Sequence, residues 1–113
     1  MHKGYKLYLE DILESVNNIF TYTGDLSYEN LIQDRMRIDA VVRNFTIIGE
    51  AANNIPQEMR DKYPIIGWRK IIDFRNVIVH DYFGIDYEIL WDIIKHKLPE
   101  LQKGIKTILE KEP

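Results

Sequence analysis

Residues 34–56 read DRMRIDAVVRNFTIIGEAANNIP and carry the clearest helical pattern in the chain. Their apolar side chains recur every three or four residues, which places most of them on one face of a helix. They are Met36, Ala40, Val41, Phe45, Ile48, Ala52 and Ile55. Asp34 is a suitable N-cap and Pro56 a stop, so the pattern predicts about twenty helical residues and a rod of roughly 30 Å. We expect this helix to be the central element of the domain.

The segments before the central helix also have helical spacing. Residues 4–23 form an apolar stripe that ends near Gly24, and Ser27 can cap a short helix running to Ile32. The stripe comprises Leu7, Leu9, Ile12, Leu13, Val16, Ile19 and Phe20. A long helix and a short one are therefore expected on the N-terminal side.

The segments after Pro56 predict further helices. Pro56 suits the first turn of a helix that ends at Lys62, and another helix is expected from after Gly67 to about Asp81. Asp86 is a fair N-cap for a helix over residues 87–98. This helix is expected to bury Ile89, Leu90, Ile93, Ile94 and Leu98. Pro99 either kinks it or begins a last helix to about Glu110, and the sequence leaves both interpretations open.

The chain as a whole has the composition of one folded domain. It has 113 residues, 45% of them hydrophobic and 29% charged, which is typical of globular rather than disordered proteins. Alternating strand patterns, internal repeats and linkers are absent from the sequence. We predict a single all-α domain over residues 1–113, an up-and-down bundle of about four to six helices.

Cysteine content and the N-terminus indicate the compartment. The chain has no cysteine, which excludes disulfides, a thiol nucleophile and cysteine-ligated zinc, and fits a reducing environment. The first residues lack the apolar core of a secretory signal, and no window approaches the length of a membrane span. We therefore expect a cytoplasmic protein with no membrane partner.

The net charge gives no general sign of nucleic-acid binding. It is −3, with a pI near 5.6, so a positive surface for RNA has to be local. The candidate cations are Arg35 with Arg37, Arg43, Arg69 with Lys70, Arg75, and Lys95-His96-Lys97. The simpler interpretation is that most of them belong to solvated helix faces.

The residues suited to chemistry gather in one stretch, FRNVIVHDYFG at residues 74–84. Glycine-rich phosphate loops, H-E-x-x-H and EF-hand patterns are absent, and the histidines lie on separate segments, so we expect no metal and no cofactor. In this stretch Arg75, Asn76, His80 and Tyr82 offer a cation, an amide, an imidazole and a phenol. These four are the candidate site residues.

Helix geometry limits how these groups can meet. If the helix continues through them, Asn76 and His80 share a face, so the amide can orient the ring, and the negative helix end favours protonated imidazole. Arg75 would lie about 140° around the axis from His80. The two therefore reach one phosphate only through the length of the arginine or with the help of a second chain, which favours a dimer.

Spacing alone also allows a purely structural interpretation. A histidine and an arginine at a helix end commonly form a cap and a surface ion pair, here with Asp73, Asp81 or Asp86. Tyr82 would then be a core or interface aromatic.

The spacing of Arg75, His80 and Tyr82 resembles the R-x4-H-x-Y motif of HEPN proteins. The surroundings are similar to the HepT-like branch in particular. Residues 40–52 resemble the second conserved block of that branch, and residues 68–86 with Trp91 and residues 98–101 resemble the third. The resemblance covers nearly the whole chain and departs from the family at no motif position.

The resemblance implies a helical bundle that forms a homodimer, with the motif of each copy lining a shared cleft. It implies a metal-independent endoribonuclease, the toxin of a toxin–antitoxin pair whose antitoxin is an MNT-type nucleotidyltransferase. In such pairs the partner can adenylylate the tyrosine of the H-x-Y element, here Tyr82, and so silence the toxin.

The chemistry of the residues suits this implication. RNA carries its own nucleophile, the 2′-hydroxyl, so cleavage without a metal needs proton transfer and a cation for the charged phosphorane. We expect His80 to supply acid–base function, Arg75 to stabilise the phosphorane, Asn76 to position one or both, and Tyr82 to contact a base or phosphate. The alternative is a non-catalytic nucleotide-binding subunit that associates with a nucleotidyltransferase, and a purely structural bundle is the third hypothesis.

Overall fold

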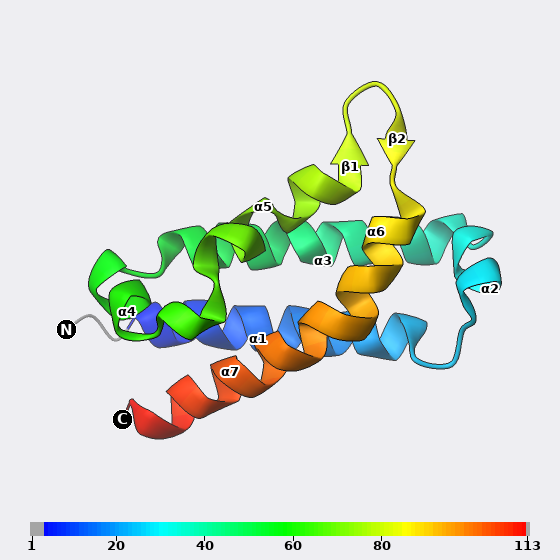
Figure 1. Ribbon diagram of the computed structural model, residues 1–113. Helices are drawn as coiled ribbons and strands as arrows, with labels where there is room; N and C mark the ends of the chain where they lie inside the picture. The colour runs from blue at the N-terminus through cyan, green and yellow to red at the C-terminus, as the bar shows by residue number, and fades with distance from the viewer. Residues whose placement is uncertain (1–3, 113) are drawn as a thin grey trace.

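The computed structural model describes residues 4–112 and confirms the all-α bundle. Two long helices, α1 (Gly4–Thr23) and α3 (Arg35–Asn54), run antiparallel along the length of the molecule (Figure 1). The short α2 (Tyr28–Ile32) lies at the turn between them. The molecule is elongated, with extents of 44 × 30 × 20 Å. The α3 helix has the bounds expected for the central element.

The second half of the chain covers this pair and returns along it. The α4 helix (Gln57–Lys62) and a 3₁₀ turn, η1 (Pro64–Ile66), lead to α5 (Trp68–Ile78), which packs on α3. A small β-hairpin, β1 (Val79–His80) and β2 (Gly84–Ile85), then projects from the bundle (Figure 1). The chain returns through α6 (Tyr87–Asp92), a π-helical turn η2 (Ile93–Lys97) and α7 (Leu98–Lys111), which packs on α1. The hairpin is a departure from the prediction, which had only helices and the loops between them.

The predicted N-caps Ser27, Asp34 and Asp86 are confirmed. A side-chain oxygen of each accepts a hydrogen bond from the first turn of its helix, which satisfies a donor that the helix leaves free. The donors are the N–H groups of Asn30 at 3.2 Å, Arg37 at 3.1 Å and Ile89 at 3.1 Å.

Pro99 lies in the first turn of α7, as expected if it begins the last helix, although the chain enters α7 from the π-helical turn η2 without leaving helical dihedrals. The residues at both junctions, Asp92–Ile93 and Lys97–Leu98, keep right-handed helical dihedrals. The Leu98 N–H donates to the Ile93 carbonyl, the wider π-helical pattern. Proline has no N–H and crowds the carbonyl four residues before it, so the wider turn directly before Pro99 accommodates it.

The core lies between α1, α3, α5 and the α6–α7 run. Its fully buried side chains include Leu9, Ile12, Val16, Ile19, Ile38, Val41, Phe45, Ile48, Ile78, Leu90, Leu98 and Ile105. Phe45 on α3 and Phe74 on α5 pack edge to face, with ring centroids 5.8 Å apart. The core therefore joins the central helix to the helix that carries the candidate site.

Three side chains expected in the core lie at the surface instead. Leu7 is 63% exposed, Met36 84% and Ile89 36%. Leu7 and Met36 each lie two residues before a fully buried side chain, Leu9 or Ile38, and so point about 200° away around the helix axis. The apolar spacing predicted the helices correctly, but the buried face of each helix is narrower than the set of apolar residues that we expected it to include.

Gly49 sets the distance between α3 and α5. A Cβ atom at this position would lie 2.9 Å from the backbone oxygen of Ile72, closer than the two atoms can approach. The glycine thus lets α5 lie directly on α3 at this point. Among residues 4–112, none of the helices combines the length and the hydrophobicity that crossing a membrane requires.

Candidate functional site

Helix α5 ends three residues earlier than the sequence predicted. Its last backbone bond runs from the Val79 N–H to the Arg75 carbonyl, and Val79 has extended dihedrals. The run Val77-Ile78-Val79 is β-branched and has low helix propensity, and burial of Ile78 favours the exit of the chain at this point. His80 therefore lies in β1 and not in the last turn of the helix, so the expected effect of the helix dipole on its ring does not apply.

The hairpin is closed by a tight turn at Gly84. His80 pairs with Gly84 in the two-stranded ladder, and the Phe83 N–H donates to the His80 carbonyl at 3.2 Å. Gly84 has a φ of +78°, the left-handed conformation that follows the turn in many three-residue hairpin loops and that favours glycine. This turn puts the residues between His80 and Gly84 at the tip of the hairpin.

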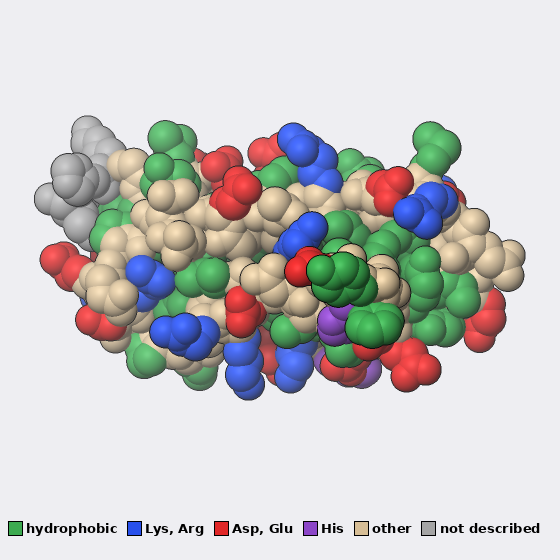
Figure 2. Space-filling model, turned by 90° about the horizontal axis from the view of Figure 1, so that it is seen from above, with side chains coloured by type: hydrophobic (Ala, Val, Ile, Leu, Met, Phe, Trp, Pro, Cys, Tyr) green, Lys and Arg blue, Asp and Glu red, His purple; other side chains and the backbone are tan. Residues whose placement is uncertain are grey.

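The hairpin tip consists of two uncovered aromatic side chains. Tyr82 is 94% exposed and Phe83 89% exposed. Figure 2 looks down on this side of the molecule and shows hydrophobic side chains that nothing covers, with a histidine beside them. The interpretation of Tyr82 as a core aromatic is therefore wrong.

His80 faces the carboxylate of Asp86. Its Nε2 lies 3.8 Å from Asp86 Oδ2, with the two side chains 44% and 36% exposed. The other carboxylate oxygen of Asp86 caps α6, and the Asp86 N–H donates to the Ile78 carbonyl at 2.7 Å. The backbone thus holds Asp86 from both sides in the position that faces the ring.

Asp86 is the residue that the sequence-based set of site residues lacked. Its sequence signal was that of an N-cap, and it stood beside Asp73 and Asp81 as a candidate ion-pair partner. The hairpin brings it back onto His80, six residues before it in the chain. A cap residue two positions after a hairpin glycine is the pattern that could have identified it.

Arg75 and Asn76 lie together in the last turn of α5 but do not bond to His80. Asn76 Nδ2 donates to Asp73 Oδ1 at 3.4 Å, so the expected contact between Asn76 and the imidazole is not formed. Arg75 is exposed, and within residues 4–112 its guanidinium takes part in no ion pair. In one chain the cation and the imidazole therefore stand at the same end of α5 without a direct link.

Some of the other candidate cations interact with neighbouring side chains. Arg35 lies 3.3 Å from Asp39, and Arg37 lies 3.2 Å from Asp34, so the structural interpretation holds for this pair. Lys95 Nζ lies over the Trp91 ring, 4.5 Å from its centroid. No three histidine or carboxylate side chains of the described residues gather closely enough to hold a metal ion.

Comparisons with known proteins agree on one family. The family model described as Ribonuclease HepT-like matches residues 12–108. A protein of Methanocaldococcus jannaschii, named as a candidate RNase, is 40% identical over 106 residues, which are 94% of this chain and 97% of that protein. A protein of Caldanaerobacter subterraneus subsp. tengcongensis with a similar name is 39% identical over 105 residues, 93% of this chain and 94% of that protein.

A third relative carries the family's own name. The "Probable ribonuclease HepT" of Thermococcus cleftensis is 37% identical over 102 residues, 90% of this chain and 93% of that protein. No solved structure matches this chain significantly.

Proposed function

This chain belongs to the HepT-like ribonuclease family, and from that membership we propose that it is a toxin-type endoribonuclease that cleaves RNA without a metal ion. The observation that supports the proposal most directly is the setting of His80. The imidazole is open to solvent on a short hairpin, faces the fixed carboxylate of Asp86, and stands at the same end of α5 as the unengaged Arg75.

Cleavage proceeds by internal attack within the RNA. The 2′-hydroxyl attacks the adjacent phosphorus, and the 5′-oxygen of the next nucleotide leaves, which produces a 2′,3′-cyclic phosphate and a 5′-hydroxyl. His80 transfers the protons that this exchange requires, and Arg75 stabilises the negative charge of the phosphorane. Asp86 acts as a positioning residue, because it limits the directions in which the His80 ring can turn.

A second copy of the chain completes the site. Arg75 and His80 have no direct contact within one chain, and one imidazole cannot be both proton acceptor and proton donor at the same moment. In a homodimer with two hairpins facing a shared cleft, one His80 accepts the proton of the 2′-hydroxyl and the other donates to the leaving oxygen. Asn76 lies beside Arg75 and positions the phosphate with it.

Tyr82 is the residue through which an MNT-type nucleotidyltransferase antitoxin silences the toxin. The phenolic oxygen attacks the α-phosphate of ATP, pyrophosphate leaves, and AMP remains on the ring. Tyr82 is 94% exposed, so the partner reaches it without unfolding the hairpin. The added AMP places bulk and negative charge two residues from His80, where it competes with the RNA phosphate.

Purified protein, expressed without its partner and incubated with RNA and a chelator, tests the proposal. Wild type should release fragments with 2′,3′-cyclic phosphate ends, and His80→Ala should lower the rate by about a hundredfold or more, with helical content unchanged by circular dichroism. His96→Ala is the matched control, since His96 is an exposed histidine of η2 whose Nδ1 lies 3.0 Å from Asp92 Oδ1.

Two results would contradict the assignment. A His80→Ala protein that cuts RNA at the wild-type rate removes His80 from the mechanism. A wild-type protein that binds a nucleotide or the transferase but leaves RNA intact would instead support the non-catalytic binding subunit.

A further inference from the structure

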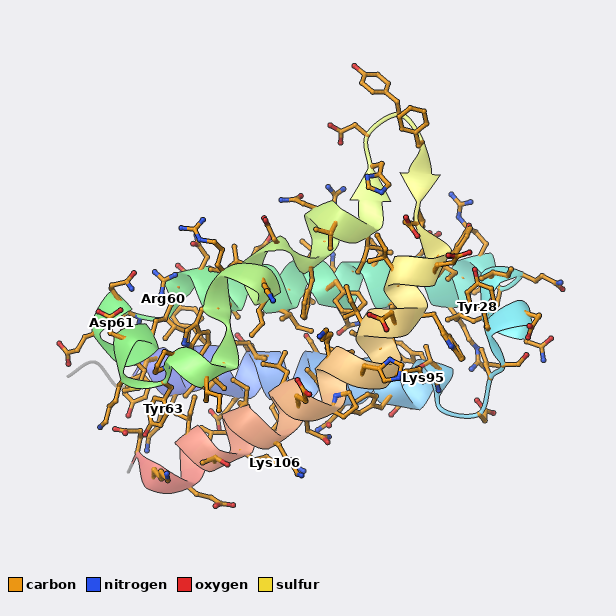
Figure 3. All side chains as sticks on the ribbon, in the orientation of Figure 1. Tyr28, Arg60, Asp61, Tyr63, Lys95 and Lys106 are labelled. Atoms are coloured by element: carbon orange, nitrogen blue, oxygen red, sulfur yellow. The ribbon has the colours of Figure 1, made fainter. Side chains whose placement is uncertain are left out.

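A pocket with several charged residues in its wall lies at the end of α5 opposite the hairpin. Its walls come from the end of α3, from α4, from η1 and from the first two turns of α5, and it has a volume of about 730 Å³. We call it the α4–α5 pocket and define it by its charged residues, Arg60, Asp61, Arg69, Lys70 and Asp73. Figure 3 labels Arg60 and Asp61 on α4, at this end of the molecule.

The cations of the α4–α5 pocket are unengaged. Within residues 4–112, none of Arg60, Arg69 and Lys70 lies within ion-pair distance of a carboxylate. By contrast, Arg35 and Arg37 at the opposite end of α3 are both paired. In a chain with a net charge of −3, the pocket is a local concentration of available positive charge.

The carboxylates of the pocket are already engaged by amides. Gln57 Nε2 donates to Asp61 Oδ1 at 2.8 Å, and Asn76 Nδ2 donates to Asp73 Oδ1 at 3.4 Å. These bonds hold the acidic groups in place at the wall. The pocket therefore has three positive side chains and two negative ones, and both negative ones already accept hydrogen bonds, so its net charge favours an anion.

Arg60 adds a donor that lacks an acceptor. Its Nε is buried and has no hydrogen-bond partner. A buried N–H without an acceptor is unfavourable, and most such groups in proteins find a partner. Arg60 lines the pocket, so rotation of its side chain toward the pocket would bring Nε within reach of an oxygen of a bound phosphate.

Helix α5 carries residues of both the α4–α5 pocket and the candidate site. Arg69, Asp73 and Asn76 follow one another at intervals of four and three residues, so they share one face of the helix. Asp73 lines the pocket and bonds to Asn76, the neighbour of Arg75. From Arg69 to Asn76 the helix rises roughly 10 Å, a distance that an RNA strand spans with a few nucleotides.

We propose that the α4–α5 pocket binds a backbone phosphate of the RNA strand whose scissile bond lies at Arg75 and His80. This inference rests on the proposed function and extends it to the substrate contacts beyond the cleavage site. The pocket recognises the charge of the strand and not its bases, so it raises affinity for longer RNA without selecting a sequence.

Binding of fluorescently labelled RNA to a His80→Ala protein tests the proposal without cleavage. The pocket variant adds Arg69→Gln and Lys70→Gln, and the matched control adds Lys103→Gln and Lys106→Gln, two exposed lysines on α7, of which Figure 3 labels Lys106. Each protein is titrated at several salt concentrations with a long single-stranded RNA and with a dinucleotide too short to reach the pocket. Thermal unfolding checks that the exposed substitutions leave the fold intact.

The pocket variant should bind the long RNA on the order of tenfold more weakly than the control, with a salt slope smaller by about 0.7 for each phosphate that the variant no longer neutralises. Both proteins should bind the dinucleotide equally. Equal affinities and equal salt slopes for the long RNA would overturn the inference. So would equal weakening for both RNA lengths together with competition by AMP, because the pocket would then be a free-nucleotide site.

Cleavage by the wild-type protein separates this inference from the proposed function. A wild type that leaves RNA intact, with a pocket variant that has lost affinity for long RNA, contradicts the nuclease and supports the pocket. A wild type that cleaves RNA, with a pocket variant that binds like the control, contradicts the pocket and supports the nuclease.

Discussion

Substitutions of Asp86 can separate its two contacts. One carboxylate oxygen accepts the Ile89 N–H and caps α6, and the other lies 3.8 Å from His80 Nε2. Serine caps helices as well as aspartate does but is too short and uncharged to act on the ring. Alanine loses both contacts, and asparagine keeps the cap while it removes the charge. The three variants therefore report on stability and on activity independently.

The expected magnitudes follow from the two contacts. Loss of an N-cap costs about 1 kcal/mol, which lowers the Tm of a domain of this size by about 4–8 °C. The pair with His80 is about 40% exposed, and exposed ion pairs contribute roughly 0.2–1 kcal/mol. Removal of that contribution from the transition state corresponds to a fall in kcat/KM of up to about fivefold. We expect Asp86→Ser and Asp86→Asn to lower kcat/KM by up to about fivefold while they avoid the fall in Tm that loss of the N-cap causes, and Asp86→Ala to lower both kcat/KM and Tm.

Initial rates of RNA cleavage with a chelator present and thermal unfolding followed by circular dichroism measure the two effects. Asp34→Ser, at the N-cap of α3, is the matched control and should leave the cleavage rate unchanged. Wild-type kcat/KM in Asp86→Ser would show that the carboxylate does nothing for His80. A rate that falls only in Asp86→Ala would assign Asp86 a purely structural role.

Three further predictions concern other positions. Tyr82→Phe keeps the exposed ring and lacks the acceptor oxygen, so the toxin should escape silencing by its partner; mass spectrometry that finds AMP on another side chain would refute this assignment. Gly49→Ala forces a Cβ against the Ile72 oxygen and should lower the free energy of unfolding by about 1–3 kcal/mol. An unchanged denaturation midpoint would mean that α3 and α5 can move apart to accept the methyl group at no cost in stability. Hydrogen bonds from Lys62 and then Tyr63 lower the pKa of Glu112 from its ordinary value, so this carboxylate stabilises the fold at pH above the ordinary value and ceases to do so as pH falls through the lowered pKa. Glu112→Gln should therefore lower Tm at pH 7, and the difference from wild type should shrink at pH 3; a constant difference at both pH values would contradict the linkage.

Much of the helical architecture follows from neighbouring residues in the sequence. The caps Ser27, Asp34 and Asp86 act within one turn of their own helices, and apolar spacing reflects the period of a helix, so the sequence alone determines these elements. The family motif is likewise a matter of residue order. Residue order alone therefore suffices to propose Arg75, Asn76, His80 and Tyr82 as one site, although their roles remain predictions.

The tertiary structure decided which of those residues meet. The sequence predicted a helix through His80, but packing of Ile78 and the turn at Gly84 end α5 early and fold the chain back, so that Asp86 and not Asn76 faces the imidazole. The same holds for the α4–α5 pocket, whose walls come from segments that are separate in sequence. Contacts between segments depend on how buried faces pack against one another, and the period of a single helix carries no information about that packing.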